Sequence, residues 1–437
     1  MNNSVNNTDA RKRIVSLFDD GSFTEIDAFA KSADGEIEVV AGYGSINGSP
    51  AYAFSQDVSV SSGAISVAQC SKIKKIYDLA IKTGCPVVGI YDSNGVKLTE
   101  GFDAINAYGE ILKASTSVSG VVPQISIVAG ACLGTSALKA NMADVVIAVK
   151  DADFYLCAPS DATASDSYEA GNVDILADDI DMAISKAKQV VSYLPSNNLS
   201  PAGMFDFAES TPCAEGMNAC QIVESIADAN SVIEIKAGYA NNVTTAFATV
   251  AGSTVGFVAF DGQALCPGCS YKAESFIKLC DAFSIPVITI ANADGMNKDK
   301  EAQLLIAVTK LTSTYATATC PKISIVTGQA IGSAYIVLAG KGANADLAFA
   351  WDNSVISPLD VDASVAFLYN DRLANGEDRE SLKAEYKETI GSAFGAAACG
   401  AIDDVFAPSL TRAKVISALD MLAGKRETTI PRKHSVK

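Results

Sequence analysis

The chain has 437 residues, of which 49% are hydrophobic and 19% are charged. At roughly 150 residues per domain, this length predicts about three domains or two large ones, and the composition excludes a disordered or fibrous chain. The 33 basic and 50 acidic residues give a net charge of −17, which argues against a nucleic-acid-binding protein.

The first residues, MNNSVNNTDARKR, are polar and lack the apolar core of a signal peptide. No run of about 18 apolar residues is present that could span a bilayer. The 11 cysteines are scattered, mostly within apolar runs, as expected of reduced thiols. We therefore expect a cytoplasmic protein without direct membrane insertion.

The elements of the first half alternate between helix and strand. Residues 71–83 and 102–115 carry apolar side chains at helical spacing. Residues 86–91 and 124–128 are runs of β-branched side chains, typical of strands that are buried on both faces. This alternation predicts an α/β fold in which helices pack on sheets.

A turn-rich segment follows the first of these strands. Residues 91–101 contain the Asp, Asn and Gly signals of a tight turn, including Gly95, Val96 and Lys97. Lys97 could contact a phosphate or a carboxylate, or the segment could be a plain solvated turn. Lys72 and Lys139 have the same two interpretations.

A glycine-containing corner follows the second strand and precedes a predicted helix at 133–141. Its sequence runs from Gly130 through Ala131 and Cys132 to Gly134 and Thr135. Glycine lets the backbone approach a ligand closely, and free amides at such a corner stabilise a developing oxyanion without an ionisable side chain. Alternatively, the glycines only let helix and strand pack tightly.

Residues 194–203 (LPSNNLSPAG) have the composition of a linker. A boundary near 195–215 divides the chain into an N-terminal domain at 1–205 and a C-terminal domain at 206–437.

Segments of the first half recur in the second half in the same order. The segment PQISIVAGACLG at 123–134 returns as PKISIVTGQAIG at 321–332, roughly 200 residues later. Two further pairs match in the same way: 84–92 with 284–292, and 143–149 with 345–351. We infer a duplicated domain. The second copy of the corner contains Gly332, Ser333 and Ala334.

The number and positions of the histidine and cysteine residues limit the reactions that this chain could catalyse. The one histidine, His434, lies in a basic tail, which we expect to be solvated. Its position argues against Ser-His-Asp hydrolysis, Cys-His proteolysis and histidine-ligated metals. Cys266 and Cys269 have CxxC spacing, but no second pair exists that could complete a zinc site, so we expect no metal. The pair is either a redox motif or a turn with two incidental thiols.

Several segments together carry a resemblance to a known family, from about Arg11 to the end of the chain. They are 13–27 (RIVSLFDDGSFTEID), 42–48 (GYGSING), 54–57 (FSQD), 72–80 (KIKKIYDLA), 191–198 (VSYLPSNN), 280–286 (CDAFSIP), 402–405, 411–412 and 425–434. The ordered set resembles the carboxyltransferase (β) subunit of biotin-dependent acyl-CoA carboxylases and related decarboxylases.

The resemblance implies two tandem crotonase-like ββα-superhelix domains, the first holding acyl-CoA and the second carboxybiotin. It also implies a homo-hexamer and biotin carried on a separate protein. The partners would be a biotin carrier protein with either a biotin carboxylase or a membrane decarboxylase subunit, because this chain has no biotinylation motif and no ATP-grasp loop.

Carried over by position, the resemblance assigns two pairs of backbone amides. Those of Gly134 and Thr135 would hold the thioester enolate, and those of Ser333 and Ala334 would hold the ureido oxygen of biotin. A carboxyl group would then move between carboxybiotin and the α-carbon of a short-chain acyl-CoA. The substrate-binding positions implied are Gly95, Val96, Lys97, Gly130, Ala131, Cys132, Gly295, Gly332 and Ile336.

The glycine motifs depart from the family pattern. Thr135 and Ser333 replace glycines, which keeps the amide but narrows the pocket by a Cβ. A non-catalytic scaffold of such a complex is therefore an alternative, and a crotonase-type hydratase or isomerase is another. The acyl group, the direction of reaction and sodium coupling stay open.

Overall fold

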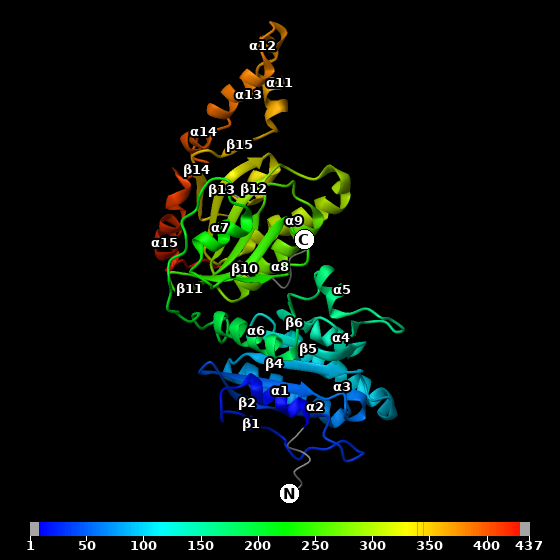
Figure 1. The fold of residues 1–437 in the computed structure, drawn as a ribbon. Coiled ribbons are helices and arrows are strands. Elements are labelled where there is room, and N and C mark those ends of the chain that lie inside the picture. Colours follow the sequence, from blue (N-terminus) through cyan, green and yellow to red (C-terminus); the bar gives the residue numbers. More distant parts are fainter. Residues whose placement is uncertain (1–7, 339, 344, 429–437) are drawn as a thin grey trace. The chain divides into compact units, whose positions relative to one another are not determined.

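The computed structural model describes residues 8–338, 340–343 and 345–428. The predicted basic tail with His434 lies outside this range. The chain splits into two compact units, Met1–Gly203 and Met204–Lys437, within the segment that we predicted to contain the boundary. Each unit is built on one eight-stranded sheet (Figure 1).

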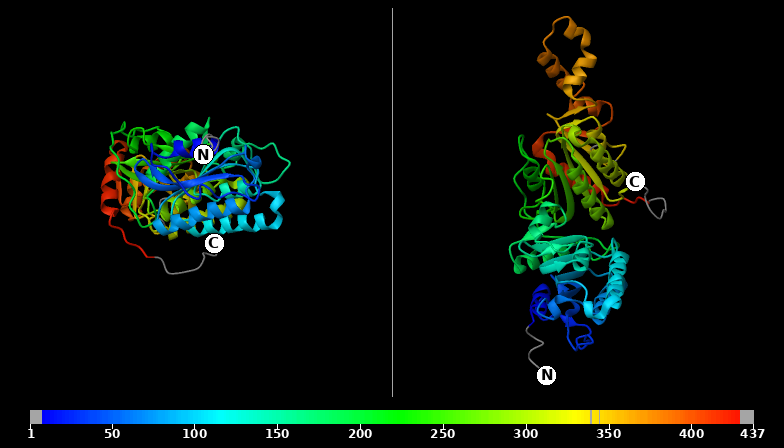
Figure 2. Two further views of the ribbon diagram at one scale, coloured as in Figure 1. Left: turned by 90° about the horizontal axis from the view of Figure 1, so that it is seen from below. Right: turned by 90° about the vertical axis from the view of Figure 1, so that its right-hand side faces the viewer.

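The sheet of the first unit has the order β1-β2-β3-β4-β5-β6-β8, with β7 paired to β5. Its strands are β1 (Thr24–Glu25), β2 (Val39–Ile46), β3 (Ser49–Gln56), β4 (Val87–Ser93), β5 (Gln124–Leu133), β6 (Val145–Val149), β7 (Phe154–Tyr155) and β8 (Ile175–Ala177). Its helices are α1 (Asp9–Leu17), η2 (Ser61–Gly63), α2 (Val67–Thr83), η3 (Leu98–Glu100), α3 (Gly101–Val118), α4 (Thr135–Ala140), α5 (Ala164–Glu169) and α6 (Ile180–Tyr193). Helices α2 and α3 run side by side along the sheet (Figure 2).

The second unit repeats this topology. Its sheet has the order β16-β14-β13-β12-β11-β10-β9, with β15 paired to β13, so each strand has a counterpart in the first unit. The strands are β9 (Ile233–Ile235), β10 (Val243–Val250), β11 (Ser253–Phe260), β12 (Val287–Ala293), β13 (Lys322–Ile331), β14 (Leu347–Trp351), β15 (Val355–Ser357) and β16 (Asp404–Phe406). The shared order and pairing confirm the predicted duplication.

The helices of the second unit are α7 (Ala219–Ile226), α8 (Pro267–Ala282), η4 (Lys298–Lys300), α9 (Glu301–Thr317), α10 (Ser333–Leu338), α11 (Val361–Leu368), α12 (Asn370–Ala374), α13 (Arg379–Glu388), α14 (Ala393–Ala398), η5 (Pro408–Leu410) and α15 (Thr411–Leu422). Helices α11 to α13 project from the body of this unit (Figure 1) and have a small core of their own around Val365, Leu382 and Tyr386.

Local signals explain the bounds of the predicted helix at 71–83. Helix α2 begins four residues earlier, because Ser66 is its N-cap and the Ser66 hydroxyl accepts a hydrogen bond from the Gln69 N–H. It ends at Gly84, which adopts the left-handed conformation with a φ of 67°. The first turn of α2 carries few large apolar residues, so the apolar periodicity of the sequence did not predict that it is helical.

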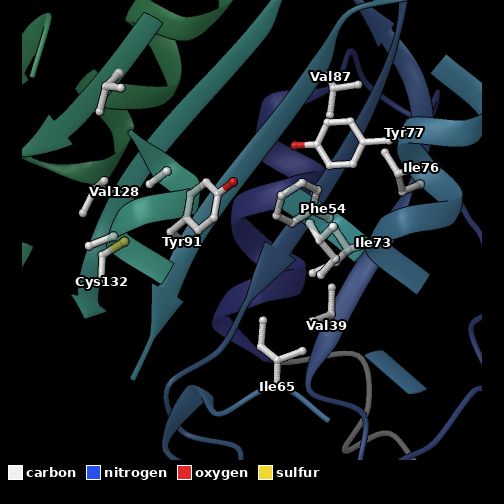
Figure 3. Packing of buried hydrophobic residues seen from close by; sticks show 14 of the residues in the cluster. Val39, Phe54, Ile65, Ile73, Ile76, Tyr77, Val87, Tyr91, Val128 and Cys132 are labelled. Atoms are coloured by element: carbon white, nitrogen blue, oxygen red, sulfur yellow. The ribbon is translucent and has the colours of Figure 1, made fainter. Parts of the chain in front are cut away.

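The core of the first unit lies between α2, α3 and the sheet. Figure 3 shows Ile73, Ile76 and Tyr77 of α2 beside Phe54 and Tyr91 of the sheet. The Phe54 and Tyr91 rings meet edge to face with centroids 5.6 Å apart. This packing fixes β4 and β5, whose carboxyl ends lead to the predicted site.

Asp144, just before β6, gives the stability of the first unit a pH dependence. Its carboxylate accepts a hydrogen bond from the Gln124 N–H at 2.8 Å, but burial raises the pKa of Asp144 to about 7. The unfolded value is about 3.9, so the folded state binds this proton more tightly and stability falls as the pH rises from about 4 to 7.

We expect the unfolding free energy of Asp144→Asn at pH 8 to be higher than that of the wild type by about 1–2 kcal/mol. This is less than the full pKa shift implies, because the Asp144 side chain is partly exposed. At pH 3 the two proteins should be nearly equal, since Asp144 is then largely protonated in both the folded and the unfolded state. Urea unfolding at both pH values measures this difference. Asp151→Asn, at an exposed aspartate, is the control; an equal gain at both pH values for D144N would contradict the assignment.

Candidate active site

Strand β5 ends at a sharp corner into α4. Gly134 makes this corner with φ 57° and ψ −119°, a conformation that glycine adopts far more readily than other residues. The next amides, of Thr135 and Ser136, have no acceptor within the described part of the chain. Thr135 is half-buried and Ser136 is buried.

Two predicted contacts at this corner need correction. The Gly134 N–H donates to the Tyr155 carbonyl at 2.9 Å, so it is not available to an oxyanion. The Cys132 N–H donates to the Asp153 carbonyl at 2.8 Å, and the Cys132 side chain is fully buried. Both residues lie where β5 pairs with β7, a pairing that the sequence pattern did not reveal.

The second corner has the same geometry. Gly332 turns with a φ of 59°, and its N–H donates to the Ser357 carbonyl at 2.8 Å. The amides of Ser333 and Ala334, at the start of α10, have no acceptor among the described residues. These are the two residues predicted for the second copy, and their equivalents in the first copy are Thr135 and Ser136.

A close approach explains one glycine in each copy. A Cβ on Gly130 would lie 2.5 Å from Asp92 Oδ1, and a Cβ on Gly328 would lie 2.5 Å from Asn292 Oδ1. Asp92 is held in place by Arg13, whose guanidinium lies 2.7 Å from Asp92 Oδ2. Close packing against Asp92 therefore requires a glycine at position 130 of β5. This agrees with the alternative interpretation of the sequence, in which the glycines of the corner serve tight packing.

We expect Gly130→Ala to lower the unfolding free energy by about 1–3 kcal/mol, because the new methyl group must displace the buried Asp92 carboxylate. The backbone of Gly130 does not have a positive φ, so the change tests crowding alone. The matched control is Gly109→Ala in α3, where a Cβ meets nothing within 4 Å and stability should rise by up to about 1 kcal/mol. Chemical denaturation of both variants tests this; equal effects would refute the crowding argument.

The turn at 93–97 lies beside the first corner. A Cβ on Gly95 would lie 3.4 Å from the Leu133 carbonyl. A chain of hydroxyl groups joins the two segments: Ser93 Oγ accepts from the Gly95 N–H at 3.0 Å, and Ser136 Oγ lies 3.0 Å from Ser93 Oγ and 2.7 Å from the Tyr108 hydroxyl. The structure thus brings the predicted Gly95 to the corner, whereas Val96 pairs with Ile65.

The second turn is held in the corresponding way within its own unit. The Leu265 N–H donates to the Gly295 carbonyl at 3.0 Å, just as the Ile65 N–H donates to the Gly95 carbonyl at 2.9 Å. Gly295 has a φ of 74°. Gly295 is thus the positional equivalent of Gly95 in the repeat.

The three lysines considered for phosphate contacts are all buried, so none of them is a solvated surface residue, and Lys97 contacts carboxylates of this chain itself. Lys97 Nζ lies 2.5 Å from Asp34 and 3.0 Å from Glu38, and these carboxylates neutralise its charge. Lys72 Nζ donates to the Val39 carbonyl at 2.8 Å. Lys139 Nζ lies 5.0 Å from the centre of the Tyr77 ring, within the core.

A cavity lies along the helix that follows each corner. The first, of about 240 Å³, lies along α4 and is lined by Ala137, Leu138, Asn141, Phe154, Tyr155, Leu156, Ser167 and Asn172. The second, of about 680 Å³, lies along α10 and is lined by Gly332, Ser333, Tyr335, Ile336, Ile356, Ser357, Pro358, Ile390, Gly395, Ala396, Cys399 and Ala401. The predicted Ile336 contributes an exposed apolar side chain to it.

Sequence reasoning missed Ser136, Ser93 and Asp92 as parts of this arrangement. Ser136 could have been found from the repeat alone, because it aligns with Ala334, which was predicted. The roles of Ser93 and Asp92 depend on contacts between β4 and β5, and no local pattern reports these.

Each of the two repeated α/β units therefore has a glycine corner with free amides and a cavity along the helix that follows it. The chain matches the carboxyl transferase domain over residues 2–165 and 162–436. It is 32% identical to the methylmalonyl-CoA carboxyltransferase 12S subunit of Propionibacterium freudenreichii subsp. shermanii, over 97% of this chain and 90% of that protein. It is 34% identical to the propionyl-CoA carboxylase beta chain of Saccharopolyspora erythraea, over 97% and 89%.

A solved structure of transcarboxylase 12S, described as a hexamer with methylmalonyl-CoA and methylmalonic acid bound, superposes with a TM-score of 0.91 at 31% identity. The superposition covers 99% of this chain and 92% of that one. The chain belongs to the carboxyl transferase family. This membership confirms the predicted tandem crotonase-like fold and carboxyltransferase class, and it does not support the hydratase or scaffold alternatives.

Among the described residues, no helix is long and apolar enough to cross a membrane. Within the same part of the chain, no cluster of three His, Cys, Asp or Glu side chains is arranged to hold a metal ion.

Proposed function

We propose that this chain transfers a carboxyl group between carboxybiotin and the α-carbon of propionyl-CoA, whose carboxylated form is methylmalonyl-CoA. The observation that carries the proposal is the pair of equivalent corners with free amides in a member of the carboxyl transferase family. Support for the three-carbon acyl group comes from the relatives, which are a methylmalonyl-CoA carboxyltransferase, a propionyl-CoA carboxylase and a methylmalonyl-CoA decarboxylase.

In the first unit, we assign the amides of Thr135 and Ser136 to the thioester oxygen. This oxygen becomes an enolate oxygen when the α-carbon loses its proton or its carboxyl group. A fixed N–H that points at a developing oxyanion stabilises the transition state, by about 2.7–4 kcal/mol for one donor. The hydroxyl chain from Ser136 to Ser93 holds this corner in place.

In the second unit, the cavity along α10 fits biotin. The bicyclic ring of biotin is mostly apolar and carries one ureido carbonyl. The cavity has an apolar wall with Ile336, and it is lined by Ser333, whose amide is free; the free amide of Ala334 follows in the chain. Carboxybiotin would supply the carboxyl group, and the biotin anion the base. The chain itself needs only to hold the two oxygens, which agrees with its lack of a placed histidine in the described range.

We further propose that the chain acts as a homo-hexamer with a separate biotin carrier protein. The hexamer described for transcarboxylase 12S supports this assembly. A biotin carboxylase or a membrane decarboxylase subunit would complete the system.

The test is the loss of carboxylated acyl-CoA in the presence of free biocytin. Malonyl-CoA, methylmalonyl-CoA and glutaconyl-CoA would each be incubated with the purified protein, with native mass measured in parallel. We expect methylmalonyl-CoA to be decarboxylated to propionyl-CoA fastest. Turnover of only one of the other two would refute the acyl assignment, and a hexamer without any turnover would refute the catalytic proposal.

A further inference from the structure

Two cysteines at the start of α8 have no part in the proposed function. Cys266 is the N-cap of this 16-residue helix, Pro267 occupies its first position and Cys269 lies in its first turn. Cys266 is half-buried and Cys269 is buried, and both are free thiols. The CxxC motif is therefore the start of a long helix and not an isolated turn.

The two thiols cap the helix reciprocally. The Cys266 N–H donates to Cys269 Sγ at 2.9 Å, and the Cys269 N–H donates to Cys266 Sγ at 3.3 Å. Each sulfur thus lies against the backbone of the other cysteine. This arrangement brings the sulfurs together on one side of the first turn, as a disulfide between positions i and i+3 requires.

The repeat shows that capping does not need sulfur. The equivalent helix of the first unit, α2, has Ser66 at the N-cap and Gln69 three positions on, and the Ser66 hydroxyl accepts from the Gln69 N–H at 3.4 Å. Serine caps helices at least as well as cysteine does. The second unit carries sulfur at both positions at once, which points to a chemical role for the pair.

The surroundings activate one thiol over the other. Hydrogen bonds from the Cys269 thiol, the Cys269 and Gly268 N–H groups and the Asn242 side chain lower the pKa of Cys266, although burial opposes them. The helix N-terminus favours the same thiolate. The hydrogen bond with the Cys266 side chain, together with burial, raises the pKa of the Cys269 thiol. An accessible acidic thiol beside a buried one is the arrangement of an attacking and a resolving cysteine.

We propose that Cys266 and Cys269 form a redox-active dithiol that small-molecule disulfides such as oxidised glutathione convert to an intramolecular disulfide. The Cys266 thiolate attacks one sulfur of the reagent, forms a mixed disulfide and releases one glutathione thiolate. The Cys269 thiol, after losing its proton to solvent, then attacks Cys266 Sγ and displaces the second glutathione. Two protein thiols are oxidised, and one glutathione disulfide is reduced to two thiols.

The dithiol is connected to the turn beside the second corner. Leu265, the residue before Cys266, donates its N–H to the Gly295 carbonyl at 3.0 Å and accepts from the Asn297 N–H at 2.9 Å. In the reduced state the Cys266 N–H donates a hydrogen bond to Cys269 Sγ. Because the disulfide changes the position of this sulfur, its formation shifts the Cys266 backbone. On the basis of the proposed function, oxidation should lower turnover at the biotin-binding corner, and reduction should restore it.

The test is peptide mass spectrometry of the full chain after equilibration in glutathione redox buffers and trapping of free thiols by alkylation. We expect the 266–269 peptide to lose two hydrogens without a glutathione adduct. Cys269→Ala should instead stop at a glutathione adduct on Cys266, and Cys266→Ala should leave Cys269 alkylated. Exposed Cys157, in the same sample, is the control that ends as a mixed disulfide.

Two outcomes overturn the proposal: alkylated Cys266 and Cys269 in a buffer that fully modifies Cys157, or a stable glutathione adduct on Cys266 of the wild type. This readout requires no enzymatic activity, so it stands apart from the carboxyl transfer test. A disulfide that forms without changing biocytin-dependent turnover would refute only the coupling to Gly295.

Discussion

Thr135→Pro should lower the turnover of methylmalonyl-CoA with biocytin by about 10²–10³-fold, the effect of removing one oxyanion donor. Proline has no N–H, so the variant deletes the first free amide of the corner. Thr135 is the first residue of α4, where proline is well tolerated because no intrahelical bond is lost. Stability should therefore stay close to that of the wild type.

Thr135→Ala is the matched control, since it removes the side chain and keeps the amide, and its turnover should remain within a few-fold. Affinity for the acyl-CoA should change little in T135P, because the amide acts chiefly on the enolate-like transition state. Calorimetric binding together with the turnover number separates these effects. A T135P variant with near-normal turnover and an intact fold would remove Thr135 from the catalytic machinery.

Asp228→Ala should destabilise the second unit by about 3–5 kcal/mol, because it removes the buried carboxylate that pairs with the partly buried Arg412 guanidinium. Asp228 follows α7, and its side chain is 2% exposed. Its carboxylate accepts hydrogen bonds from Arg412 at 2.5 Å and from the Ala251 and Gly252 N–H groups at 3.0 and 2.9 Å. Asp228 thereby connects α15 to the segment that follows α7.

The single tryptophan of the chain makes this effect measurable. Trp351 is buried in the second unit, and its indole N–H donates to Thr411 Oγ1 at 2.9 Å, at the first residue of α15. Tryptophan fluorescence during urea unfolding therefore reports on the docking of α15. Asp404→Ala, which removes an ion pair to Lys414 with both side chains at least 40% exposed, is the control and should cost at most about 1 kcal/mol.

The loss of stability in Asp228→Ala should also depend on pH. Burial tends to raise the pKa of Asp228, but the hydrogen bonds from Arg412, Thr249, Gly252 and Ala251 outweigh it, and the net pKa is lowered. A lowered folded pKa stabilises the fold above the unfolded value of about 3.9, and this contribution disappears as the pH falls through the folded pKa. The difference between D228A and the wild type should therefore shrink in acid. A difference that does not vary with pH would contradict the ion-pair explanation.

The class of fold and the duplication follow from the amino-acid sequence alone. Buried parallel strands require long apolar runs and helices that cover them, so both the strands and the helical periodicity leave a visible pattern. The recurrence of 123–134 as 321–332 then located both corners, because a duplicated segment keeps its strand–turn–helix signal. The family resemblance rested on the same ordered segments and was confirmed.

Which backbone amides of the corners are free depends on the tertiary structure. Gly134 donates to Tyr155 because β5 pairs with β7, and Lys97 is neutralised by Asp34 and Glu38 from a loop some 60 residues away in sequence. The sequence pattern contains no signal for such partners, since a hydrogen bond or ion pair depends on distance and direction. Local periodicity reports which side of an element is buried, but only the packed chain determines what each buried polar group meets there.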